Sequence, residues 1–216
     1  DKKTLVVSFL LALISVVLSP ILVGLLGILL LLGFAGATAK NSIDRRKTLA
    51  EWHGSNLGEF FFGGLRIFLI KLVYGLIGLI IIVIAITTFT LAILSGSLDS
   101  VTLSSAIIGS GTIFLVGLAL LLLGLLFVPM AIMNYLSTGS LKDAFAIGKV
   151  IRKTLSLKFF GALIFVIAYA ILLSLIGSII AVITIGIGTL LLPGIFLYLY
   201  TVCMFEVFAE VFKETK

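Results

Sequence analysis

Long apolar runs separated by short polar segments dominate the pattern along the chain. Four runs meet or exceed the roughly 20 apolar residues that a helix needs to cross a bilayer core about 30 Å thick. They cover residues 5–39, 65–94, 106–136 and 155–212. Barrel strands alternate apolar and polar residues, which these runs do not. The pattern therefore predicts an all-α, polytopic helical membrane protein that forms a single integral membrane domain over 1–216.

The last run is long enough for two spans, which we expect at 155–183 and 191–212. A glycine-containing stretch at 184–189 favours a turn between them, and Pro193 suits the first turn of the second helix. The first run would be about 50 Å long as one helix, and Pro20 offers a natural break. The sequence thus predicts about six membrane helices if the first run is a hairpin, and five if it is one kinked helix.

Composition supports this class of protein and excludes two others. Hydrophobic residues make up 62% of the 216 positions and charged residues 11%, with a mean hydropathy of +1.40. A soluble domain carries about 25% charged residues, and a disordered chain combines low hydrophobicity with high charge. Cys203 is the one cysteine and lies in an apolar run, so one chain can form neither a disulfide nor a thiolate metal cluster.

Charge placement predicts the orientation. Basic residues concentrate in 40–66 and 142–158, whereas the connection at 95–105 has no Lys or Arg and one acidic residue, Asp99. By the positive-inside rule, both basic segments face the cytoplasm, as do both termini in the six-helix arrangement, in the cell membrane. The net charge of +6 is then a membrane-surface feature and not a nucleic-acid footprint. The predicted basic face comprises Arg45, Arg46, Lys47, Lys142, Lys149, Arg152 and Lys153.

The second basic segment has the pattern of an amphipathic helix. Over residues 140–155, apolar side chains such as Ala144 and Ile151 fall on one helical face and lysines on another, and Ser140 and Asp143 have capping-box spacing. We expect an in-plane helix on the cytoplasmic surface. Its basic face would lie among anionic headgroups, where each Lys or Arg contributes about 1 kcal/mol. Membrane lipids are therefore the first predicted partners.

Aromatic residues mark the edges of the spans. Tryptophan, tyrosine and phenylalanine are typical of the boundary between apolar core and water. The predicted interfacial aromatics are Trp52, Phe60, Phe61, Phe62 and Tyr135.

Few ionisable residues fall inside the predicted spans, and such residues are functional candidates because a membrane charge is costly. Lys71 and Glu206 would lie at comparable depths if the predicted topology holds. They form a candidate intramembrane pair lining a polar cavity. The alternative, which we favour, is that Lys71 snorkels to the surface and Glu206 faces the headgroups.

The chain also contains an internal similarity. Phe61-Phe62-Gly63-Gly64-Leu65 resembles Phe159-Phe160-Gly161-Ala162-Leu163, and each copy follows a basic segment and begins a helix pair. This predicts helix-pair repeats over 1–55, 56–139 and 140–216.

Glycine, aromatic and charged positions spread over nearly the whole chain carry a family resemblance. They are Gly33-Phe34, Lys40-Asn41, Leu49-Ala50-Glu51-Trp52, Gly58-Glu59-Phe60 through Gly64-Leu65-Arg66, Tyr74, Pro129, Tyr135, Gly139-Ser140-Leu141, and Leu192-Pro193-Gly194 with Tyr198. The chain resembles the membrane family catalogued as domain of unknown function 4013. The resemblance implies a prokaryotic, mainly archaeal source and a multi-pass topology, with no assigned activity. The chain departs from the family pattern in the stretch after Trp52 and in having Leu49-Ala50 where Leu-Pro is usual.

No catalytic, cofactor or metal constellation is visible in the sequence. His53 is the one histidine, and a catalytic triad or zinc site needs further ligands or partners beside it. We therefore expect a protein that is not an enzyme: an accessory, scaffold or lipid-associated component, acting alone, with itself or with other membrane subunits. The alternative is a small transporter or permease subunit for an apolar or lipid-like solute, which interrupted helices would suit.

Overall fold

The computed structural model describes residues 24–46, 48–51, 54–94, 100–184 and 188–215, and these are helical throughout apart from short connections. The first of the helices, Gly24–Ile43, is called helix 24–43 below. The elements that follow are η1 (Gly54–Asn56), α2 (Leu57–Leu94), α3 (Ser100–Thr138), α4 (Leu141–Ala144), α5 (Ile147–Thr154), α6 (Leu157–Ile183) and α7 (Gly188–Glu214).

Five of the described helices are long and apolar enough to cross a membrane. They are helix 24–43 and most or all of α2, α3, α6 and α7. The predicted class, a multi-pass all-α membrane protein, is therefore confirmed. The expected break at Pro20 lies outside the described residues; from Gly24 onward the chain is one uninterrupted helix to Ile43.

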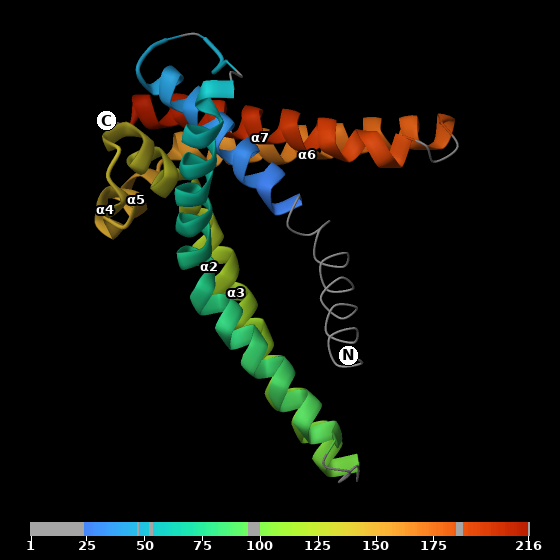
Figure 1. Ribbon diagram of the computed structural model, residues 1–216. Helices are drawn as coiled ribbons and strands as arrows, with labels where there is room; N and C mark the ends of the chain where they lie inside the picture. Colours follow the sequence, from blue (N-terminus) through green and yellow to red (C-terminus); the bar gives the residue numbers. More distant parts are fainter. Residues whose placement is uncertain (1–23, 47, 52–53, 95–99, 185–187, 216) are drawn as a thin grey trace, which may run out of the picture.

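Helices α2 and α3 form a long antiparallel pair that runs side by side over its whole length (Figure 1). Glycines set the separation: a side chain at Gly78 would overlap the backbone of Leu121, and one at Gly124 would overlap the carbonyl of Tyr74. Small residues allow membrane helices to approach this closely and to gain packing contacts. The pair is thus held by direct backbone proximity.

Helices α6 and α7 form a second antiparallel pair that leaves the meeting point of the helices in a different direction (Figure 1). Its outer surface is mostly apolar: in α6, Ile164, Leu172 and Ile179 each expose more than half of their surface. A helix that is apolar all round requires apolar surroundings, which a bilayer supplies.

The buried side chains gather where the two pairs meet, in a region that we call the junction. It joins the second half of α3 to the ends of helix 24–43, α2, α6 and α7, with α4 and α5 packed against it (Figure 1). Its buried members include Ala35, Ala39, Ile67, Ile70, Met130, Ala131, Ile132, Met133, Val150, Phe159, Phe205, Phe208 and Phe212.

The length of α2 indicates the depth of the junction in a membrane. Lys71 lies 23 residues before Leu94, about 35 Å along the helix, which already exceeds a core about 30 Å thick. The residues of α2 before Lys71 therefore extend into the headgroup layer and beyond. This depth agrees with the snorkelling interpretation of Lys71.

The expected in-plane helix over 140–155 is two short helices, so the prediction of one continuous helix was wrong. The break follows α4, where the Tyr74 hydroxyl donates a hydrogen bond of 2.8 Å to the Ala144 carbonyl. In a continuous helix that carbonyl would accept from the amide of Gly148. The Tyr74 ring also stacks on Phe145, with centroids 5.9 Å apart. Ser140 precedes α4 without a side-chain capping bond.

Candidate functional site

Helix 24–43 crosses the start of α2 at a glycine contact. A side chain at Gly33 would overlap the Phe60 carbonyl, and one at Gly64 would overlap the Leu29 carbonyl. The two backbones therefore touch at this crossing, as small-residue motifs permit.

A cleft of about 270 Å³ opens beside this crossing and is called the polar pocket. Helix 24–43 contributes Lys40, α2 contributes Glu59 and Arg66, and α3 contributes Tyr135. The remaining lining is glycine and apolar: Gly33, Gly36, Ala37, Phe60, Phe62, Gly63, Ile67, Leu136 and Gly139.

One of the charged side chains of the polar pocket, Arg66, is held by a hydrogen bond. A guanidinium nitrogen of Arg66 donates to the Tyr135 hydroxyl at 3.4 Å. Glu59 precedes Arg66 by seven residues, so both lie on one face of α2, about 10.5 Å apart along its axis. Among the described residues, Lys40, Glu59 and Arg66 form no ion pair. All three residues are exposed, so two positive charges and one negative charge share the pocket in contact with solvent.

Sequence reasoning did not single out Lys40, Glu59 or Arg66 as site residues. A signal was nevertheless present, because all three lie in the stretches that carry the family resemblance. Tyr135 and Gly139 in the same pocket belong to those stretches as well. These stretches are distant in sequence, and only the helix crossing brings them to one cleft.

The basic face predicted from the sequence is largely exposed. Arg45, Arg46, Lys142, Lys149 and Arg152 are all exposed, and Lys47 lies outside the described residues. Lys149 lies 3.7 Å from the Asp143 carboxylate.

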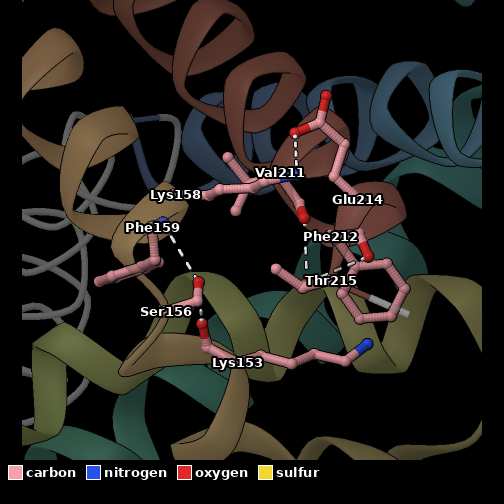
Figure 2. A network of polar contacts seen from close by, with 8 residues as sticks. All are labelled: Lys153, Ser156, Lys158, Phe159, Val211, Phe212, Glu214 and Thr215. Atoms are coloured by element: carbon pink, nitrogen blue, oxygen red, sulfur yellow. Dashed lines mark hydrogen bonds and ion pairs between the residues drawn. The ribbon is translucent and has the colours of Figure 1, made fainter.

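Lys153 differs from the rest of the predicted basic face. It is half-buried, and its ammonium lies 3.2 Å from the centroid of the Phe212 ring, a cation–π contact with α7 (Figure 2). The turn after α5 is also ordered: the Ser156 hydroxyl donates to the Lys153 carbonyl at 2.8 Å and accepts from the Phe159 amide at 3.2 Å. The cation–π contact joins α5 to the end of α7, and the Ser156 hydrogen bonds join α5 to the start of α6.

A second cleft, the lateral pocket, lies between α2, α3 and α5 and has a volume of about 430 Å³. Its lining is almost wholly apolar: Val73, Tyr74, Ile77, Leu120, Leu123, Gly124, Phe127, Phe145, Ile147, Val150 and Ile151.

The structure does not join Lys71 to Glu206. Lys71 is half-buried in a third cleft of about 280 Å³, beside Pro129 and residues of α7. Glu206 instead accepts a hydrogen bond of 2.5 Å from the Ser42 hydroxyl, which links helix 24–43 to α7. No ion pair between the two is present in the described residues.

The expected interfacial aromatics separate into exposed and buried members. Phe62 is 59% exposed and Phe61 is half-buried, whereas Trp52 lies outside the described residues. Tyr135 is buried in the junction, and Phe60 is buried between α2 and helix 24–43. Phe60 is buried because α2 begins at Leu57, which places its ring against Phe34, with centroids 5.9 Å apart.

Comparison with known proteins places the chain in one family. The family model described as Protein of unknown function (DUF4013) matches residues 16–182. No curated protein and no solved structure matches the chain. The match covers helix 24–43 and the elements from η1 to α6, apart from the last residue of α6, and so includes the polar pocket and the lateral pocket.

Proposed function

The chain belongs to the family described as Protein of unknown function (DUF4013), and we propose that it acts as a non-enzymatic, lipid-associated membrane component. It would act alone, with further copies of itself, or as a subunit of a larger membrane complex. The observation that carries this proposal is the pairing of an apolar cleft with a basic surface on the same short helix, α5.

The two sides of α5 match the two parts of a phospholipid. Ile147 and Ile151 line the lateral pocket, whose apolar walls suit acyl chains. Lys149 and Arg152 are exposed on the same helix, where a headgroup would lie. Amphipathic helices with this division lie in the membrane interface and attract anionic lipids.

Depth along α2 supports the same assignment. Tyr74, at the edge of the lateral pocket, lies 20 residues before Leu94, about 30 Å along the helix. That distance equals the thickness of a bilayer core, so the pocket lies where acyl chains meet headgroups.

Lipid retention by the purified full-length protein tests the proposal. Native mass spectrometry in the presence of phosphatidylglycerol would be compared between the wild type and a Lys149→Gln, Arg152→Gln double variant. At about 1 kcal/mol for each residue, we expect roughly 30-fold weaker retention. The control, Lys158→Gln with Lys213→Gln, changes the net charge equally away from α5. Unchanged retention in the α5 variant would overturn the proposal.

A transporter for a lipid-like solute is the second candidate. The supporting observation is the cleft that holds Lys71 beside Pro129, because a proline inside a helix frees a backbone carbonyl within the span. Proteoliposomes containing a fluorescent phospholipid distinguish the two functions. Protein-dependent movement of the lipid between leaflets would favour transport, whereas movement equal to that of empty vesicles supports the non-enzymatic component.

We infer further that the junction faces the cytoplasm of the cell, because the exposed basic residues gather there. Cysteine labelling in a Cys203→Ser background tests this orientation. Arg152→Cys should react with a membrane-impermeant reagent in inverted vesicles and stay unlabelled in intact cells. Labelling in intact cells would reverse the orientation.

A further inference from the structure

We propose that the polar pocket binds a phosphate group that carries a primary ammonium group a few bonds away, the chemistry of an ethanolamine phosphate headgroup. This site is separate from the lateral pocket and uses none of the α5 side chains on which the lipid-association proposal rests. It assigns a ligand class to Lys40, Glu59, Arg66 and Tyr135, which together line one cleft of about 270 Å³.

The positive side of the pocket fits a phosphate. The Arg66 guanidinium has five N–H donors, and one of them forms the hydrogen bond to the Tyr135 hydroxyl. That bond directs the guanidinium toward the cleft and leaves the other donors for an oxyanion. Lys40 approaches the same cleft from helix 24–43 and supplies a second positive charge. A phosphate between them would accept hydrogen bonds from two different helices.

The negative side of the pocket selects the second group of the ligand. Glu59 lines the same cleft, on the same face of α2 as Arg66 and about 10.5 Å nearer the start of the helix. A purely anionic ligand would bring its charge close to this carboxylate and gain nothing from it. A ligand with an ammonium beyond its phosphate places opposite charges at both ends. A primary ammonium also donates hydrogen bonds to the carboxylate, which a trimethylammonium group cannot do.

The depth of the pocket indicates a lipid as the source of this headgroup. Counted from Leu94 at the far edge of the core, Arg66 lies 28 residues or about 42 Å along α2, so its backbone is about 12 Å beyond a core about 30 Å thick. Its long side chain reaches back toward the headgroup layer. Phe62, which also lines the pocket, is mostly exposed and offers an apolar surface beside the charges. Free ethanolamine phosphate shares the same recognition chemistry, so the experiment has to separate the two sources.

Native mass spectrometry of the full-length protein, titrated with phosphatidylethanolamine, phosphatidylglycerol or phosphatidylcholine, tests the inference. We expect the wild type to retain phosphatidylethanolamine best. Lys40→Gln or Arg66→Gln should weaken its retention roughly tenfold or more, while Arg46→Gln, an exposed control outside the pocket, should leave it unchanged. Glu59→Gln should weaken phosphatidylethanolamine retention alone and so remove the preference over phosphatidylglycerol.

The outcomes separate this inference from the proposed function. The Lys149→Gln, Arg152→Gln variant should lose phosphatidylglycerol yet keep phosphatidylethanolamine. Displacement of the lipid by soluble ethanolamine phosphate, but not by inorganic phosphate, would confirm the headgroup chemistry. Binding of the soluble compound without any lipid retention would assign the site to the free compound. Equal retention of the three lipids, or an unaltered preference in Glu59→Gln, would overturn the inference.

Discussion

The two helix pairs begin with nearly the same five residues and pack in different ways. In α2, Gly64 brings the helix into backbone contact with Leu29 of helix 24–43. In α6, the corresponding residue is Ala162, which is buried, and the neighbouring Phe159 packs its ring on Phe208 of α7 at 5.3 Å. The two motifs differ by the methyl group of Ala162, and α6 packs through side chains where α2 packs through its backbone.

The difference continues along the two pairs. In the first pair, the backbones of α2 and α3 approach so closely at Gly78, Gly117 and Gly124 that an added side chain would overlap the facing helix. In the described part of the second pair, a side chain at Gly177 of α6 would meet the Phe196 ring of α7 before any backbone atom of that helix. The backbone crossing at Gly64 therefore lies beside a charged cleft, whereas the aromatic contact at Phe159 lies in the buried apolar core.

The largest expected effect comes from removing the backbone contact. Gly64→Leu would place a side chain where the Leu29 carbonyl lies, and because backbone atoms cannot move aside locally, we expect a loss of more than about 3 kcal/mol. Gly161→Leu, in the matching motif of α6, has open space within 4 Å and should be nearly neutral. Thermal unfolding in detergent measures both variants. Equal destabilisation would show that the two motifs pack alike.

A smaller effect should distinguish the glycines within the two pairs. Gly78→Ala introduces a methyl group against the Leu121 backbone and should cost about 2 to 3 kcal/mol. Gly177→Ala meets the Phe196 ring, which can rotate away, so we expect less than about 1 kcal/mol. The ratio of the two losses in free energy of unfolding, from the same measurement, tests whether α2 and α3 are the more closely packed pair. A larger loss at Gly177 would contradict it.

The spans were predictable because they depend on local composition. The sequence places apolar runs at 65–94 and 106–136, and the helices extend these by several residues at the ends that reach beyond the membrane core. Such extensions carry polar residues, including Glu59, and hydropathy excludes them from a span, whereas Arg66 lies just inside the apolar run 65–94.

Features that depend on contacts between distant segments were missed. The break between α4 and α5 arises from a hydroxyl on α2, Tyr74, which no periodicity within 140–155 can reveal. The polar pocket combines residues from three helices, and its Tyr135 lies about 70 residues after the charged residues of α2. Glu206 also has a partner, Ser42, that its depth alone did not suggest.

The bond between Ser42 and Glu206 joins helix 24–43 to the second pair by a side-chain hydrogen bond, beside the ring contact of Phe34 with Tyr198. Ser42→Ala removes the donor and leaves the half-buried carboxylate without it. We expect a loss of about 1 to 2 kcal/mol, below that of the backbone contact at Gly64. Glu210→Gln, on the exposed side of α7, is the matched control and should change stability by less than about 0.5 kcal/mol. A neutral Ser42→Ala would mean that packing alone holds helix 24–43 to α7.

The smallest effect is expected where the second pair is joined by exposed charges. Lys158 at the start of α6 and Glu214 at the end of α7 lie 3.1 Å apart, and both side chains are 57% exposed (Figure 2). Solvent screens such a pair, so Glu214→Gln should lower stability by less than about 0.5 kcal/mol, and added salt should reduce the difference further because the Debye length shortens. Unfolding of both proteins at low and high salt measures this. A loss as large as that of Ser42→Ala, unchanged by salt, would mean that the α6 and α7 ends are held by this ion pair and not by the Phe159 and Phe208 rings.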